Sequence, residues 1–187
     1  VQDIIDGTAT SRDLREVDLD DLLGRKPVTL DWASITAGLK GKRVVVTGGG
    51  GSIGSELCRQ LVRLQPAKLI LIDQGEFNLY SIASELAESG NGVDVLPLLA
   101  DVCDESAMRH IFSMQKPEVV FHAAAYKHVP LLQDQARETV RNNVLGTRVV
   151  AEASTAAGCQ TFVLISTDKA VNPTSLMGAS KRLAEIV

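Results

Sequence analysis

The sequence RVVVTGGGGSIGSE, residues 43–56, is the segment on which the fold depends. Its β-branched run at 44–47 predicts a buried strand, and a cluster of glycines follows directly. Apolar residues then recur at helical spacing, at Ile53, Leu57, Leu61 and Leu64. The segment therefore predicts a strand, a glycine turn and a helix over 53–64.

The glycines fall in the pattern G-x-x-G-x-x-G at Gly48, Gly51 and Gly54. A pyrophosphate can approach the backbone closely there because no Cβ intervenes, and the start of the helix offers free N–H groups. A mobile glycine-rich turn is the alternative interpretation. The residues expected to contact a dinucleotide cofactor here are Thr47, Gly48, Gly51, Ser52, Ile53 and Gly54.

Strands and helices alternate from residue 43 onward. We expect strands at 43–47, 68–73, 93–99, 118–122 and 161–166, and helices at 53–64, 77–89, 104–115, 129–157 (one helix or a broken pair) and from about 176. The strands at 69–72 and 162–165 are apolar throughout, which indicates burial on both faces. The pattern predicts a Rossmann-type α/β domain, a doubly wound parallel sheet with helices on both faces.

The first part of the chain, residues 1–42, is more polar and is expected to form an N-terminal helical arm. One short helix is predicted near 18–23 and a second at 32–39, with Trp32, Ile35 and Leu39 packing on the main body. The start at Val1 suggests that a preceding region has been removed. We expect residues 43–187 to form one further domain, which binds a dinucleotide through the glycine turn.

Composition narrows the class of protein. The chain has 187 residues, 45% of them hydrophobic and 22% charged, with a net charge of −4 and a pI near 5.4. No basic cluster marks a nucleic-acid or membrane surface, and no apolar run approaches the roughly 20 residues that span a bilayer. The piece is expected to be soluble. Its cysteines (58, 103, 159) and histidines (110, 122, 128) lack metal-ligand spacing, so no metal site is predicted.

Asp73 ends the second predicted strand, 19 positions after Gly54. A carboxylate there can accept hydrogen bonds from the ribose hydroxyls of NAD and would repel the 2′-phosphate of NADP. It could instead only cap the following turn. Asp101 and Val102 follow the third predicted strand and are expected to contact the adenine. Ala123, Ala124 and Ala125 follow the fourth predicted strand, and the cofactor is expected to lie against their small side chains.

The fifth predicted strand ends in Ser166-Thr-Asp-Lys169, and Met177-x-x-x-Lys181 follows. Here the chain resembles the extended short-chain dehydrogenase/reductase superfamily, with methionine in place of the tyrosine of Tyr-x-x-x-Lys. Together with HAAAYKHVP (122–130), GSIGSELC (51–58) and DLLGR (21–25), these features resemble the CapD-type nucleotide-sugar 4,6-dehydratases of bacterial polysaccharide biosynthesis.

The resemblance implies a redox-neutral conversion of a UDP-N-acetylhexosamine, UDP-N-acetylglucosamine above all, to a 4-keto-6-deoxy sugar with NAD as cofactor. It implies that Thr167 binds the C4 oxygen, Asp168 protonates the departing C6 hydroxyl and Lys169 takes the C5 proton. Lys181 would hold the nicotinamide ribose. Asn143 would support the active-site helix and belong to the cofactor-binding residues. Met177 leaves the usual tyrosine function unfilled. Possible substrate contacts are Tyr126, Lys127, His128 and Asn172; for the first three, capping of the next helix is an equal alternative.

The resemblance also implies a membrane-anchored parent protein at the cytoplasmic face of the bacterial inner membrane, serving capsule or lipopolysaccharide synthesis. It further implies that residues 43–187 are an NAD-binding Rossmann domain truncated before the substrate-binding part. The long helical stretch at 129–157 would suit a homo-oligomer. Two other functions stay open. One is an NAD-dependent nucleotide-sugar epimerase, and the other is a non-catalytic NAD-binding regulator.

Overall fold

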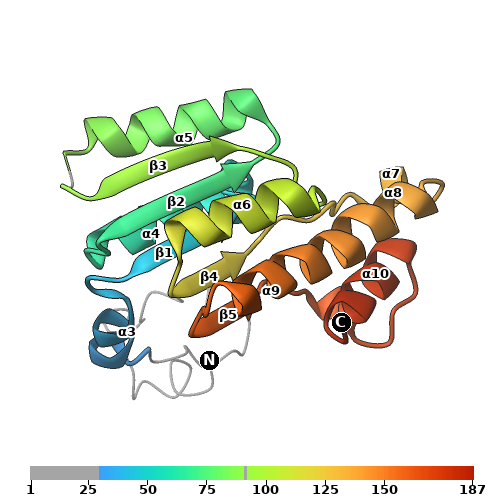
Figure 1. Ribbon diagram of the computed structural model, residues 1–187. Coiled ribbons are helices and arrows are strands. Elements are labelled where there is room, and N and C mark those ends of the chain that lie inside the picture. Colours follow the sequence, from blue (N-terminus) through green and yellow to red (C-terminus); the bar gives the residue numbers. More distant parts are fainter. Residues whose placement is uncertain (1–29, 91) are drawn as a thin grey trace, which may run out of the picture. The chain divides into compact units, whose positions relative to one another are not determined.

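The computed structural model describes residues 30–90 and 92–187. Its central sheet has five strands, all parallel, in the order β3-β2-β1-β4-β5 (Figure 1). The strands are β1 (Arg43–Thr47), β2 (Lys68–Asp73), β3 (Asp94–Leu99), β4 (Val119–His122) and β5 (Thr161–Leu164). This strand order confirms the predicted Rossmann-type sheet. Strands β2 and β3 extend the sheet on one side of β1, and β4 and β5 extend it on the other side.

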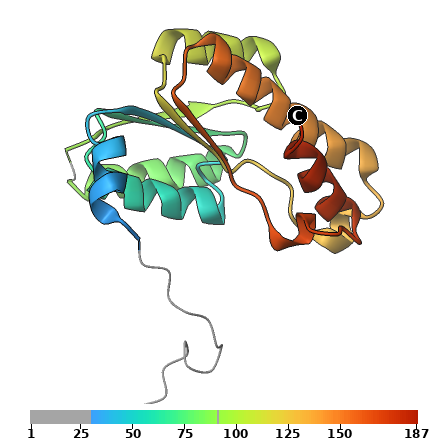
Figure 2. The same ribbon diagram turned by 90° about the horizontal axis from the view of Figure 1, so that it is seen from below.

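Helices cover both faces of the sheet, with α4 and α5 on one side and α6 and α9 on the other (Figures 1 and 2). The larger helices are α3 (Trp32–Leu39), α4 (Ser52–Arg63), α5 (Glu76–Glu88), α6 (Glu105–Gln115), α9 (Gly146–Ala156) and α10 (Leu176–Ala184). Shorter pieces are α7 (Val129–Leu132), α8 (Ala136–Val140), a π-helical turn (Arg141–Leu145) and a 3₁₀ turn (Asp168–Ala170). No helix in this part of the chain has both the length and the apolar character needed to cross a bilayer.

Two hydrophobic clusters hold these layers together. Successive strand residues point to opposite faces, so Val44 and Val46 pack toward α4 and α5 while Val45 packs toward α6 and α9. The second strand is divided in the same way, with Leu71 on the first face and Ile70 on the second. The central strands are therefore buried on both sides, as their continuous apolar runs predicted.

Some predicted boundaries need correction. The stretch 129–157 is broken, because α7 ends before residues 133–135 and a continuous helical run then extends from α8 through the π-helical turn to α9. Ile35 and Leu39 pack on the core, but Trp32 is 55% exposed, because only the later part of α3 reaches the hydrophobic cluster. The predicted helix at 18–23 lies outside the described residues.

Candidate functional site

The glycine turn is packed rather than loose. Gly48 has φ of +66°, and a Cβ there would fall 2.7 Å from the backbone nitrogen of Ala124. A Cβ on Gly54 would overlap the carbonyl oxygen of Gly48. The N–H of Gly50 donates to Asp73 Oδ2 at 2.9 Å, which ties the turn to the end of β2. These contacts argue against the interpretation of a mobile loop.

The first turn of α4 is left open. Gly51 is its N-cap, and no side chain accepts a hydrogen bond from the turn, whereas α6 and α10 are capped by Asp104 and Ser175. The early N–H groups of a helix have no partner within the helix and carry a partial positive charge. Helix α4 can therefore offer these groups to an anion.

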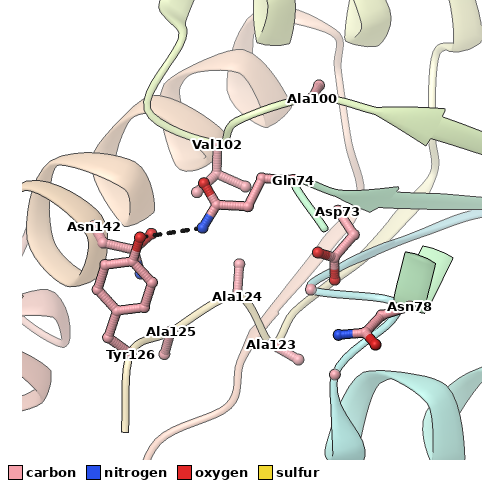
Figure 3. Close-up of a pocket in the computed structure, with 12 residues that line it drawn as sticks. Asp73, Gln74, Asn78, Ala100, Val102, Ala123, Ala124, Ala125, Tyr126 and Asn142 are labelled. Carbon is pink, nitrogen blue, oxygen red and sulfur yellow. Dashed lines mark hydrogen bonds between the residues drawn. The ribbon is translucent and has the colours of Figure 1, made fainter. Parts of the chain in front are cut away.

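A cavity that we call cavity A, of about 180 Å³, opens above the ends of β1, β2 and β4 (Figure 3). Its lining comprises Gly48, Gly51, Asp73, Gln74, Asn78, Ala100, Val102, Ala123, Ala124, Ala125, Tyr126 and Asn142. Seven of these were predicted as cofactor contacts and an eighth, Tyr126, as a substrate contact. Gln74 Nε2 donates to the Tyr126 hydroxyl at 3.2 Å and so links two walls of the cavity.

Asp73 both caps its turn and faces cavity A. Its Oδ1 accepts from the N–H of Gly75 at 2.8 Å, and its Oδ2 accepts from Gly50. The carboxylate is thus held in one orientation while it lines the cavity. No Arg or Lys stands among the described residues of this lining, so nothing there would offset the charge of a 2′-phosphate.

A second cavity, cavity B, of about 380 Å³, adjoins cavity A. It is lined by Gly51, Ser52, Ile53, Gly54, Ala123, Ala125, Tyr126, Lys127, Ile165, Ser166, Thr167, Lys169, Met177 and Lys181. Four residues line both cavities, namely Gly51, Ala123, Ala125 and Tyr126. The two cavities therefore form one trough along the carboxyl ends of the strands, with Asp73 at one end and Lys181 at the other.

Lysine and hydroxyl groups gather in cavity B. Lys181 is only 4% exposed, and its Nζ donates to the carbonyl oxygen of Ile165 at 2.7 Å. Burial lowers the pKa of Lys181, opposed by the charge of Glu185. Met177 occupies the tyrosine position of the motif, is buried, and lines the same cavity. The predicted Met177-x-x-x-Lys181 pair is thus brought together with Thr167.

Asp168 stands apart from this group. Its side chain is 87% exposed and lines neither cavity. The Thr167 hydroxyl donates to Asp168 Oδ1 at 2.9 Å, and Lys169 Nζ lies 3.4 Å from the same oxygen. The hydrogen bond from Thr167 lowers the pKa of Asp168, and the charge of Lys169 lowers it further. The carboxyl group is therefore ionised at neutral pH in this arrangement.

Several other predicted residues also lie outside both cavities. Asp101 accepts from the backbone N–H of Cys103 and pairs with Arg141 at 2.7 Å. His128 precedes α7 as its N-cap and lines a third cavity next to cavity B. Asn172 has φ of +47° in the loop before α10. Asp101 was predicted to contact the cofactor, and His128 and Asn172 to contact the substrate, but none of the three lines cavity A or cavity B.

Thr47 and Asn143 are buried behind the trough. Thr47 Oγ1 lies 2.6 Å from Nδ1 of His122. Asn143 accepts from the N–H of Tyr126 at 2.8 Å and donates to Ser180 on α10 at 2.9 Å. Asn143 is thus hydrogen-bonded to the helix that carries Lys181, but it lines neither cavity A nor cavity B.

Sequence reasoning assigned no role to six lining residues: Gln74, Asn78, Ala100, Asn142, Ile165 and Ser166. Gln74 directly follows Asp73 at the strand end, so its position alone could have signalled it, whereas Asn78 lies in the first turn of α5. Asn142 lies in the π-helical turn, which changes which residues of the helix face inward. No local sequence pattern marks that turn.

The fully buried His122 predicts a pH dependence of stability. Burial lowers its pKa from 6.5 to about 3, with a smaller contribution from the charge of Lys181. Below pH 6.5 the unfolded chain takes up a proton that the folded chain refuses. The free energy of unfolding should therefore fall as the pH is lowered, by up to about 1.4 kcal/mol per pH unit from this group.

Denaturant titrations between about pH 7 and about pH 5 measure this slope. His122→Asn should reduce the slope, and His110→Gln, at an exposed position of α6, is the control substitution. Equal slopes for wild type and His122→Asn would contradict the assignment.

Comparison with solved structures supports the fold. The chain superposes on the X-ray structure of Pen from Bacillus thuringiensis with a TM-score of 0.73 and 28% identity, covering 79% of this chain and 44% of that one. It also superposes on DesIV, a dTDP-glucose 4,6-dehydratase from Streptomyces venezuelae solved with NAD bound, with a TM-score of 0.66 and 24% identity, covering 77% of this chain and 49% of that one.

Curated relatives extend beyond this chain. It is 47% identical to the capsular polysaccharide biosynthesis protein CapD of Staphylococcus aureus over 100% of its own length and 31% of the relative's. It is 50% identical to the probable polysaccharide biosynthesis protein EpsC of Bacillus subtilis, over 97% of this chain and 30% of the relative. It is 32% identical to an inverting UDP-N-acetylglucosamine 4,6-dehydratase of Campylobacter jejuni, over 75% of this chain and 40% of the relative. The chain thus spans about a third of the length of these relatives.

The match to a family model is nearly as long as the domain. Residues 44–187 match the family described as "Polysaccharide biosynthesis protein", a range that runs from β1 through α10 and contains both cavities. The chain therefore belongs to this polysaccharide biosynthesis protein family, within the short-chain dehydrogenase/reductase superfamily.

Proposed function

We infer that this chain is the cofactor-binding and catalytic part of an NAD-dependent UDP-N-acetylglucosamine 4,6-dehydratase for bacterial surface polysaccharide synthesis. The observation that carries the proposal is the continuous trough from Asp73 to Lys181. A carboxylate suited to ribose hydroxyls stands at one end, and a hydroxyl with two lysines stands at the other. The substrate class is taken from the UDP-N-acetylglucosamine 4,6-dehydratase of Campylobacter jejuni.

The residues of the trough fit NAD. Gly51 adds no side chain where the two cavities meet, and α4 begins there without a side-chain cap. Asp73 is held toward cavity A, and the floor between the two ends consists of Ala123 and Ala125. Bound NAD supplies hydride acceptance and return for a sugar that is oxidised and reduced within one turnover.

The chain's own groups would then orient the sugar and move protons. Thr167 would bind the C4 oxygen and Lys169 would accept the C5 proton, and both residues line cavity B. Lys181, which lines the same cavity, would hold the nicotinamide ribose. For Asp168 to protonate the departing C6 hydroxyl, substrate must shield its exposed carboxyl from water, because desolvation raises a carboxyl pKa.

Met177 cannot accept or deliver a proton through its thioether. We propose that Asp168 or Lys169 takes over the proton transfer that a tyrosine would perform at this position. Met177→Tyr should then leave turnover within about tenfold of wild type, because catalysis does not depend on this side chain. Steady-state kinetics of the full-length protein check this, and a rate gain of about a hundredfold would show that the phenol was missing.

The decisive experiment incubates the full-length protein with UDP-N-acetylglucosamine and analyses the nucleotide sugar by mass spectrometry. Loss of one water with appearance of a 4-keto product supports the dehydratase. An isomer of unchanged mass would instead support an epimerase, an alternative favoured by the position of Asp168 outside cavity B. Binding of NAD without any product would support a regulator.

A further inference from the structure

A chain of buried polar groups lies directly behind the trough and belongs to neither cavity. Its members are Thr47 at the end of β1, His122 at the end of β4, and Thr147 and Asn143 on the helical run that follows α8. Each is at most 3% exposed. Buried polar groups of this kind are costly unless their hydrogen bonds are all made, so their pattern is informative.

The directions of these hydrogen bonds fix the tautomer of His122. The Thr147 hydroxyl donates its one proton to the carbonyl oxygen of Asn143 at 2.7 Å. The 3.0 Å contact between Thr147 Oγ1 and His122 Nε2 must then be donated by the ring, so Nε2 carries the proton. The neutral ring leaves Nδ1 as an acceptor, and Thr47 Oγ1 donates to it at 2.6 Å.

Asn143, at the far end of this series of hydrogen-bonded groups, contacts residues at the walls of both cavities. Asn143 accepts from the N–H of Tyr126 at 2.8 Å and donates to its carbonyl oxygen at 3.0 Å. The same amide donates to Ser180, the residue before Lys181. Tyr126 lines both cavity A and cavity B. A shift of Asn143 would therefore move a wall shared by both cavities.

We propose that His122 is a positioning residue which, as the neutral Nε2–H tautomer, joins the glycine strand to the π-helical turn and so holds Tyr126 and α10 in place for the cofactor. The Nε2–H proton and the Thr147 hydroxyl are the essential links. The part concerning the cofactor rests on the proposed function. The geometric part, which concerns Asn143 and Tyr126, does not.

Nitrogen-15 NMR of the imidazole in the 187-residue chain tests the tautomer without any substitution. We expect a proton on Nε2 and none on Nδ1 near neutral pH. A ring protonated on Nδ1, or on both nitrogens, would overturn the proposal. Because this measurement uses the unaltered chain, it is decisive even if a variant fails to fold.

Thr147→Val tests the link to Asn143, because it removes the hydroxyl and keeps the side-chain volume. The amide hydrogen of Tyr126 should exchange about tenfold faster in this variant, and NAD affinity should fall about tenfold. Thr147→Ser restores the hydroxyl and should restore both values. Ser154→Ala is the matched control, since Ser154 is also buried on α9 and bonds the carbonyl oxygen four residues earlier, at 2.7 Å, outside this chain of groups.

The outcomes separate the two proposals. Wild-type chain that binds no NAD would contradict the proposed function and leave the exchange measurement to decide on His122. Unchanged Tyr126 exchange in Thr147→Val, or an equal effect from Ser154→Ala, would overturn the positioning role whatever the NAD affinity.

Discussion

Lys169→Ala should abolish dehydration in the full-length protein, with a loss in kcat of about 10²- to 10⁴-fold, the usual contribution of a general base. The physical reason is that Lys169 lines cavity B together with Thr167 and, in the proposed mechanism, accepts the C5 proton of the sugar. Product formation from UDP-N-acetylglucosamine measures the loss.

The loss must be separated from misfolding and from loss of cofactor. Lys169→Ala should keep the wild-type unfolding temperature and NAD affinity, because its side chain is half exposed and its contact with Asp168, at 3.4 Å, lies at the surface. Lys40→Ala, which removes an exposed lysine that lines neither cavity, is the control for charge alone. Full activity in Lys169→Ala would refute the assignment of the base.

Gly54→Ala should destabilise the domain by about 2–4 kcal/mol and remove NAD binding, as expected for overpacking against rigid atoms. The added Cβ would overlap the carbonyl oxygen of Gly48, and backbone at this point cannot yield as a flexible side chain could. Relief would require the glycine turn to move away from α4. Denaturant unfolding and calorimetric titration with NAD give the two quantities.

Gly38→Ala is the matched control for this substitution. Gly38 also lies in a helix, α3, but a Cβ there meets no atom within 4 Å. It should therefore stabilise the domain by about 0.5–1 kcal/mol, as alanine usually does in place of a helical glycine. If Gly54→Ala bound NAD with unchanged affinity, the close approach of helix and turn would not be required for the site.

The sequence by itself determined the sheet and the position of the glycine turn. Apolar runs such as 69–72 are continuous because both faces of a parallel strand are covered, so local composition already reports burial. Gly51 and Gly54 are likewise required locally, because a Cβ at either position would come close to the carbonyl oxygen of Gly48. Both features depend on residues near one another in the chain, and pattern reasoning detects them.

Only the tertiary structure decided how the site is divided. Asp101 pairs with Arg141, 40 positions away, instead of lining cavity A, and Asp168 lies in solvent although its neighbour Lys169 lines cavity B. The role of His122 also depends on partners distant in sequence, at the ends of β1 and in α9. Such contacts arise where strands and helices that are far apart in the chain converge, and no local periodicity or composition encodes that convergence.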